Sequence, residues 1–309
     1  MAESPTEPAG GDLEARPWLD VSGVHCEGVV WDDALGRVRF VDIPRGRVFD
    51  ADVDTDLDTD LDAADVRWFD LPAPVTAVHP TTDPATVVVA DGEGIALASR
   101  DGLTVRLAAP LAGRPHIRMN DAGVDPAGRY FAGSMAYDLE PGAASLYRLD
   151  ADRSLHTVLT DVTISNGVDW SPDATLCYFV DSPLRRVDVF DYDVTTGALS
   201  NRRVFADTSA VTGLPDGLTV DADGAVWVAF WGGSCVCRFG PDGRIERTIT
   251  LPVSQVTSCC FAGPDLDQLI ISTSTEELSP DDLRRQPMAG MIFRAEPGCR
   301  GRRTTEFVI

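Results

Sequence analysis

The chain has 309 residues, 44% of them hydrophobic and 24% charged, and its 49 acidic residues against 26 basic ones give a formal net charge of −23. Because nucleic acids and anionic membrane surfaces attract proteins through a positive field, this charge argues against both as partners. Every basic residue is arginine, so chemistry that needs a lysine nucleophile or a Schiff base is excluded. A chain of this length predicts either two domains or a fold that grows by repetition.

The N-terminal stretch, residues 1–17, is acidic and rich in proline and glycine, and it lacks the basic start and apolar core of a signal peptide. We expect a disordered acidic tail over 1–17, followed by one domain over 18–309. No apolar run approaches the roughly 20 residues that a membrane helix needs. The seven cysteines lack the spacing of a disulfide or zinc-finger framework, so buried thiols and a cytoplasmic location are expected.

Strand-like runs that follow a turn recur along the chain and set a repeat length. They begin near Arg37, Thr86, Arg129, Thr175, Ala225 and Gln268, at intervals of 43–50 residues. Units of this length built from short strands are typical of propeller blades, and the turns within each unit indicate four strands. The chain is therefore predicted to be all-β, a six-bladed β-propeller with four-stranded blades around an axial channel. Two β-sandwiches would not explain the regular interval.

Two stretches depart from this repeat. Residues 52–65 alternate aspartate with other residues, but they lack the glycine turn and terminal glutamate of an EF-hand loop, so we expect a solvated loop between strands. Residues 276–291 form a long connection inside the sixth unit and are a candidate lid over one end of the channel.

Four segments at the start of predicted inner strands superpose without gaps: 27–32, 120–125, 166–171 and 216–221. Taken singly, Asn-Gly and Asp-Gly pairs are ordinary turn signals. Inner strands of a propeller all start at the same end of the channel, however, so the first residues of these segments should converge. An oxygen-donor set of this kind suits a hard divalent cation. The converging residues are Glu27, Asn120, Asn166 and Asp216, whereas the second and sixth units have Ala77 and Ser258 at this position.

Five sequence blocks occur in consistent order between about Trp18 and the C-terminus: 25–31 (His-Cys-Glu-Gly-Val-Val-Trp), 118–135 (beginning Arg-Met-Asn-Asp), 165–173, 178–182 and 214–221. Together they resemble the signature blocks of the regucalcin and gluconolactonase family. The resemblance implies a six-bladed propeller with one divalent metal at the channel mouth, held by Glu27, Asn166 and Asp216. Oxygen ligands favour Ca²⁺, with Zn²⁺, Mg²⁺ and Mn²⁺ as alternatives.

The same resemblance implies a small-molecule sugar lactone as the partner. Arg118 and Asn120 match residues that bind the lactone, and Asp138 falls where the family often has a glutamate that contacts substrate hydroxyls. Tyr137 departs from the acid that is common beside it. The implied reaction is hydrolysis of an aldonolactone to the aldonic acid, in which the metal polarises the carbonyl and Asp216 is the general base. A related esterase or phosphotriesterase is the nearest variant, and a non-catalytic calcium-binding or scaffold propeller is the alternative from another class.

Other candidates for chemistry are weaker. The Gly-x-Ser-x-Gly elbow of serine hydrolases is absent, and Ser134 lies in a predicted strand. His25 and His116 lie close in sequence to the candidate site and could line it, although a structural role is favoured for each. Trp231 could wall the substrate site or pack within a blade.

Overall fold

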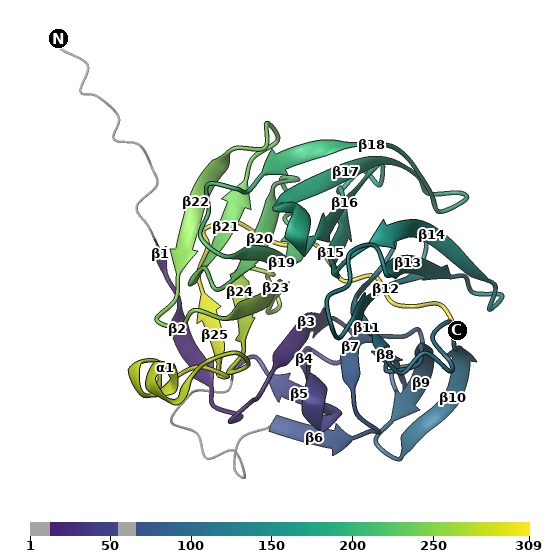
Figure 1. Cartoon of the computed structure of the whole chain (residues 1–309), viewed down its shortest axis with the longest axis horizontal. Helices are drawn as coiled ribbons and strands as arrows, with labels where there is room; N and C mark the ends of the chain where they lie inside the picture. The colour runs from purple at the N-terminus through teal and green to yellow at the C-terminus, as the bar shows by residue number, and fades with distance from the viewer. Residues whose placement is uncertain (1–12, 55–65) are drawn as a thin grey trace.

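The computed structural model describes residues 13–54 and 66–309. Within these residues, six β-sheets stand around a common axis in sequence order; five have four strands and one has a fifth strand at its edge. Figure 1 looks along the shortest axis of the molecule and shows the sheets as a ring of blades. The prediction of a six-bladed β-propeller is therefore confirmed.

The first five blades each use four strands that follow one another in sequence. The first strand of every blade contacts the first strands of its neighbours, which places it nearest the axis. The strands are β3 (Cys26–Asp32), β4 (Arg37–Asp42), β5 (Arg47–Asp52) and β6 (Val66–Asp70) in blade one; β7 (Val75–Pro80), β8 (Val87–Asp91), β9 (Ile95–Ser99) and β10 (Gly102–Ala108) in blade two; β11 (Ile117–Val124), β12 (Tyr130–Ala136), β13 (Ala144–Leu149) and β14 (Leu155–Val162) in blade three; β15 (Ser165–Trp170), β16 (Leu176–Asp181), β17 (Arg186–Asp193) and β18 (Ala198–Asp207) in blade four; and β19 (Leu214–Val220), β20 (Val226–Trp231), β21 (Cys235–Phe239) and β22 (Ile245–Thr250) in blade five.

The N-terminal strands close the ring. Blade six consists of β23 (Val256–Ala262), β24 (Gln268–Thr273), β25 (Ile292–Ala295) and, outermost, β2 (Arg16–Leu19), which pairs antiparallel with β25. The short strand β1 (Leu13–Glu14) pairs parallel with β22 of blade five. Residues 13–17, which the sequence analysis assigned to the tail, thus belong to the propeller. Residues 1–12 lie outside the described part of the chain.

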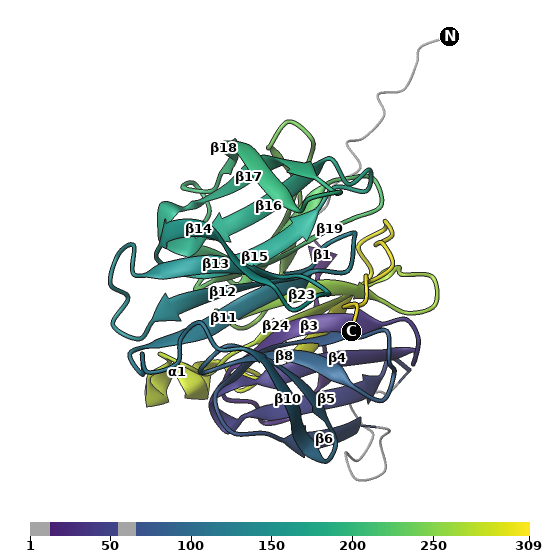
Figure 2. The same cartoon turned by 90° about the vertical axis from the view of Figure 1, so that its right-hand side faces the viewer.

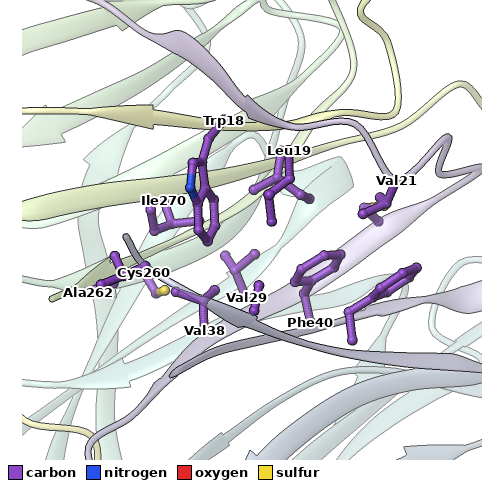
Figure 3. Packing of buried hydrophobic residues seen from close by; sticks show 14 of the residues in the cluster. Trp18, Leu19, Val21, Val29, Val38, Phe40, Cys260, Ala262 and Ile270 are labelled. Atoms are coloured by element: carbon purple, nitrogen blue, oxygen red, sulfur yellow. The ribbon is translucent and has the colours of Figure 1, made fainter. Parts of the chain in front are cut away.

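Hydrophobic burial between blades explains why β2 docks there. Trp18 is 0% exposed and Leu19 is 1% exposed, and both belong to one buried cluster with residues of blades one and six. Figure 3 shows Trp18 beside Ile270 of blade six, with Phe40 of blade one in the same cluster. Burying a tryptophan removes a large apolar surface from water, and this offsets the entropy lost when the segment becomes a strand.

Aspartates at the ends of the inner strands shape the turns of the repeat. Asp125 Oδ1 accepts hydrogen bonds from the backbone N–H groups of Ala127 and Arg129, both at 2.9 Å. Asp221 Oδ1 accepts one from the N–H of Ala225, also at 2.9 Å. The aspartates that end segments 120–125 and 216–221 are therefore turn-forming residues, which satisfy backbone donors that the tight connection would leave unpaired.

The C-terminal segment, residues 300–308, covers one end of the ring. Its backbone or side chains bond to residues of all six blades. The partners are Ala222 of blade five, Leu266 of blade six, Asp169 of blade four, Asp33 of blade one, Thr82 of blade two and Gly128 of blade three. Each of these residues lies in the second half of an inner strand or in the region beyond it, so the covered end is the one at which the inner strands finish.

Helical elements are short. They are the 3₁₀ turns η1 (Ile43–Arg45) and η2 (Ser182–Leu184) and the helix α1 (Pro280–Arg285), which lies inside the long connection of blade six. Figure 2 shows α1 and the C-terminal segment on opposite faces of the ring. Across the described residues, the search for a helix long and apolar enough to cross a bilayer found none.

Two further expectations concern the cysteines and the acidic loop. All seven cysteines are free; six are buried, as predicted, and Cys299 is partly exposed. The acidic stretch predicted over 52–65 lies mostly outside the described residues: Asp52 ends β5, and residues 55–65 are not described.

The closure by β2 leads to a prediction about stability. Trp18→Ala should lower the free energy of unfolding by about 3–5 kcal/mol, because it leaves a cavity between blades six and one. The matched control is Trp68→Ala, since Trp68 is 43% exposed on β6 and stacks with Arg47; its cost should stay below about 1 kcal/mol. Urea unfolding followed by circular dichroism measures both values. Equal losses of unfolding free energy in the two variants would contradict the role of Trp18 in closing the ring.

Candidate functional site

A β-bulge interrupts the pairing of every inner strand near its start. The registers shift between Glu27 and Val30 in β3, Met119 and Ala122 in β11, Ser165 and Val168 in β15, and Pro215 and Leu218 in β19, with shorter shifts in β7 and β23. A bulge leaves residues outside the ladder and re-aims their side chains. Asn120, Asn166 and Asp216 are bulge residues, and Glu27 immediately precedes the bulge of β3. The sequence predicted these four positions as equivalent. The bulges place Asn120, Asn166 and Asp216 at the same register, whereas Glu27 lies one residue earlier relative to its bulge.

The four predicted side chains are buried at the end of the channel where the inner strands begin. Each is 6–8% exposed. Asn120 Nδ2 donates to Asn166 Oδ1 at 3.1 Å and to the carbonyl of Ser165 at 2.9 Å. Asn166 Nδ2 donates to Ser182 Oγ at 2.8 Å, which fixes the amide with its oxygen toward Asn120. An amide oxygen has two lone pairs, so Asn166 Oδ1 keeps acceptor capacity for a further ligand.

Glycines allow the inner strands to approach closely at this level. A Cβ atom on Gly167 would lie 2.5 Å from the backbone nitrogen of Leu218, and one on Gly217 would lie 2.4 Å from Ser258 Oγ. Such contacts are too short for any side chain, and so the residue after each predicted ligand is glycine in blades four and five. Blade three differs, because the equivalent position holds Asp121.

Asp121 is a buried acid that our sequence analysis missed. It is 8% exposed, and burial raises the pKa of its carboxyl to about 6. Its Oδ1 accepts a hydrogen bond from the N–H of Ala122 at 2.7 Å. The signal was present in the sequence, since Asn120 is followed by aspartate where Glu27, Asn166 and Asp216 are followed by glycine.

The acids at this end of the channel lack enough positive charge to balance them. Burial raises the pKa of Glu27 to about 8, and the carboxylate of Asp121 adds to the rise, while the Gly28 N–H and Arg118 oppose it. Burial also raises the pKa of Asp216 well above its ordinary value, and the charges of Glu27 and Asp121 push it further. Arg118 is the nearby cation that favours the charged form of both acids. Desolvated like charges of this kind are stabilised when a cation binds between them.

The donor set fits a divalent cation by its chemistry. Two carboxylates, from Glu27 and Asp216, and the amide oxygen of Asn166 are oxygen donors of the kind that hard cations prefer. In the described parts of the chain, no three His, Cys, Asp or Glu side chains gather closely enough to hold an ion by themselves. The amide of Asn166 is therefore needed to complete a three-donor set.

Arg118 and Asn120 act as one unit. Arg118 Nη1 donates to Asn120 Oδ1 at 2.6 Å and to the carbonyl of Met119 at 2.9 Å. The guanidinium also lies 5.9 Å from the ring centroid of Tyr137, which is 56% exposed above it. Because Asn120 also donates to Asn166, the sequence of contacts runs from Arg118 through Asn120 to the predicted metal ligand. This arrangement fixes the orientation of the guanidinium, whose other N–H groups remain donors for a ligand.

Asp138 follows Tyr137 in the turn after β12. Its side chain is exposed there, and Oδ1 accepts a hydrogen bond from the N–H of Glu140 at 3.2 Å. Its predicted role as a substrate contact stays a prediction. His116 is exposed, and its carbonyl accepts a hydrogen bond from the N–H of Tyr137 at 3.0 Å.

A second group of side chains, from blades one, five and six, borders the same mouth. His25 Nδ1 lies 3.1 Å from Glu276 Oε2, and its ring centroid is 5.4 Å from that of Trp231. Trp231 Nε1 donates to Glu277 Oε2 at 3.4 Å. The first two residues of the connection 276–291, Glu276 and Glu277, thus lie at the mouth. The helix α1 within this connection has no buried residues.

The channel continues from this site toward the C-terminal segment as a cavity of about 110 Å³. Asp121, His79 and Ser258 line it on the inside, and Arg302 lines it at the covered end. Glu27, Asn166 and Asp216 are not among its lining residues. The cavity therefore lies on the far side of the predicted ligands from the open mouth.

Residues 25–275 match the sequence model of the SMP-30/gluconolactonase/LRE-like region. Regucalcin of Oryctolagus cuniculus is 39% identical to the chain, over 87% of the chain and 90% of regucalcin. Among solved structures, a calcium-binding protein, regucalcin, of Agrobacterium tumefaciens superposes with a TM-score of 0.88 at 27% identity, over 97% of this chain and all of that one. A luciferin-regenerating enzyme superposes with a TM-score of 0.84, also at 27% identity, over 93% of this chain and 96% of that one.

The buried acids lead to a prediction about the protein stripped of divalent ions. The pKa of Glu27 is raised from 4.5 to about 8, so between these values the folded protein binds more protons than the unfolded chain. Stability should therefore fall as the pH rises from about 5 to about 8, by up to about 1.4 kcal/mol per pH unit for each such group. Urea unfolding of chelator-treated protein across this range measures the slope.

Two variants separate this effect from the general charge of the chain. Asp216→Asn should raise the stability of the stripped protein near pH 8 and flatten the slope, because it removes one uncompensated buried charge. Asp223→Asn removes an acid whose side chain is 76% exposed in the turn of the same blade, and it should leave the slope unchanged. A stability that rises with pH over this window would contradict the account of the site.

Proposed function

The chain belongs to the SMP-30/gluconolactonase/LRE-like family, and from that premise we propose that it is a divalent-metal-dependent lactonase that hydrolyses an aldonolactone to the aldonic acid. The observation that carries the proposal is the convergence of Glu27, Asn166 and Asp216 with the Arg118–Asn120 unit at one mouth of the channel. An ion site alone would not need a guanidinium held in place beside it. A small uncharged or weakly charged sugar lactone is the partner that this mouth suits.

Glu27, Asn166 and Asp216 would hold the ion. Their oxygens favour Ca²⁺, with Zn²⁺, Mg²⁺ and Mn²⁺ as alternatives, and the relative from Agrobacterium tumefaciens is described as a calcium-binding protein. When bound, a divalent cation supplies Lewis-acid chemistry that polarises the lactone carbonyl and stabilises the negative charge of the tetrahedral species.

Asp216 would act as the general base. Its carboxylate is buried at the end of the channel where the ion would bind, and it could accept a proton from the attacking water there. As water attacks the carbonyl carbon, the new carbon–oxygen bond forms and a water proton passes to Asp216. When the ring carbon–oxygen bond then breaks, the proton on Asp216 can return to the departing alkoxide. The protein needs no covalent intermediate for this sequence.

Arg118 and Asn120 would position the substrate. The guanidinium projects from the start of β11 and retains N–H groups that can donate to ring or hydroxyl oxygens. Asn120 is hydrogen-bonded to Arg118 at 2.6 Å and to Asn166 at 3.1 Å. A sugar bound by Arg118 would therefore keep a fixed position relative to the metal ligand Asn166. Fixing both reactants in this way reduces the entropy cost of reaching the transition state.

A second candidate function is calcium binding without catalysis. It is favoured by the description of the Agrobacterium tumefaciens relative as a calcium-binding protein. A related esterase or phosphotriesterase activity would use the same residues on another electrophile. The three functions differ in the compounds that the metal-bound protein would hydrolyse: lactones, other esters or phosphotriesters, or none.

The test is acid release from a panel of γ- and δ-aldonolactones, with metal-stripped protein and after addition of Ca²⁺, Mg²⁺, Mn²⁺ or Zn²⁺. We expect activity that requires the ion and that falls by about 100-fold or more in Asp216→Asn, because general-base catalysis typically contributes about 10²–10⁴-fold. Asp223→Asn, at the opposite end of the same hairpin, should keep the activity of the parent protein.

The other outcomes assign the other functions. An ion that raises the melting temperature of a protein that hydrolyses no lactone, ester or phosphotriester would favour the binding protein. Equal activity in Asp216→Asn and the parent would remove Asp216 from the mechanism.

A further inference from the structure

We propose that Glu276 is a substrate-contacting residue that accepts a hydrogen bond from a hydroxyl of the bound sugar ring and so selects polyhydroxylated lactones over lactones without hydroxyls. This inference rests on the proposed function, because it concerns the same mouth of the channel. It gives one residue of the 276–291 connection in blade six a specific role in substrate recognition.

The position of Glu276 follows from the order of the blades. Arg118 lies at the start of β11 in blade three, and Glu276 comes three residues after β24 in blade six. The third and sixth blades of a six-membered ring stand opposite each other, so the guanidinium and the carboxylate approach the mouth from opposite sides. Their charges attract each other: the charge of Arg118 contributes to the lowered pKa of Glu276, and burial lowers the pKa of Arg118 while the charge of Glu276 opposes that lowering.

The carboxylate of Glu276 is oriented toward the mouth by His25. Glu276 Oε2 lies 3.1 Å from His25 Nδ1, and His25 precedes the predicted ligand Glu27 by two residues. The hydrogen bond with His25 is the largest cause that lowers the pKa of Glu276. The group is therefore a carboxylate at neutral pH, and a carboxylate accepts hydrogen bonds but cannot donate them. Sugar hydroxyls are the matching donors.

One carboxylate oxygen of Glu276 remains available to accept a hydrogen bond from a ligand. Its side chain is 44% exposed, in contrast to the buried ligands, and within residues 13–54 and 66–309 its Oε1 has no hydrogen-bond partner. Trp231, whose ring lies 5.4 Å from that of His25, adds an apolar surface on the same side. A ring that presents C–H groups to Trp231 and hydroxyls to Glu276 matches both surfaces.

The carboxylate is not needed to hold the chain in place. The N–H of Thr275 donates to the carbonyl of Val24 at 2.8 Å, and the N–H of Glu276 donates to Ser274 Oγ at 2.9 Å. Gln255 Nε2 donates to the carbonyl of Glu276 at 3.2 Å. Because these bonds use the backbone of Glu276 and its neighbours, the loop keeps its anchors when the side-chain charge is removed.

Glu276 adds an acid on the blade opposite that of Asp138. The resemblance implied that an acid at position 138 contacts substrate hydroxyls, and Asp138 belongs to the exposed turn after β12. Glu276 stands on blade six, within electrostatic reach of Arg118. A recognition of hydroxyls from blade six is thus the new element of this proposal.

The experiment compares two lactones of the same ring size, D-glucono-1,5-lactone and δ-valerolactone, which lacks hydroxyls. Glu276→Gln should lower kcat/KM for the hydroxylated lactone by about 10- to 100-fold, since a hydrogen bond to a charged group is lost. It should change kcat/KM for δ-valerolactone by less than about twofold. Glu296→Gln, which removes an exposed acid paired with Arg16, is the matched control and should change neither value.

An equal loss on both lactones would assign Glu276 a merely structural role, and no loss on the hydroxylated lactone would remove it from recognition. Either result overturns the proposal.

A binding measurement separates this inference from the proposed hydrolysis. The probe is 1,5-anhydro-D-glucitol, which has the hydroxylated ring but no ester, and calorimetry compares its binding to the parent protein and to Glu276→Gln. We expect weaker binding by the variant, and equal heats would overturn the inference. If the parent turns over no lactone but binds this probe through Glu276, the proposed hydrolysis fails while the recognition of a polyhydroxylated ring stands.

Discussion

The close approach of the inner strands around the axis is the constraint on which the site depends. At Gly167 and Gly217 a Cβ atom would come within 2.5 Å of an atom of the next blade, so the strands can meet there only without side chains. Bulges at the same level take the preceding residues out of the ladder and direct them to the channel. Backbone packing, and not any attraction among the polar groups themselves, thus brings Asn166 and Asp216 together with Glu27.

This packing places several carboxyl groups close together away from water, which is electrostatically unfavourable. Glu27, Asp121 and Asp216 are acids with raised pKa values in a desolvated space, and the charge of Arg118 opposes this rise for Glu27 and Asp216. A fold that gathers acids in this way gives up stability in its metal-free form and recovers it when a cation binds. Such a trade of stability for a prepared binding site is common where a protein carries out chemistry.

An N-terminal strand closes the ring of blades, and the C-terminal segment covers one end of the channel. β2 supplies the outer strand of blade six and buries Trp18, so the ring closes and the inner strands keep their distance from the axis. The C-terminal segment bonds to all six blades at the other end and covers the channel there. The open mouth is left between Arg118 on blade three and the His25–Glu276 pair that joins blades one and six.

Local pattern was enough to reveal the repeat, the all-β class and the equivalence of Glu27, Asn120, Asn166 and Asp216, because turn residues and strand alternation are properties of neighbouring residues. The same pattern did not place Leu13 to Pro17 in the propeller, since a strand without a turn beside it is recognised only by its partners, here β22 and β25. Nor could it find Asp121 as a buried acid, or place Glu276 beside His25 across the channel from Arg118. Those facts depend on which blades face each other across the channel and on how far each loop reaches, and only the closed ring decides that.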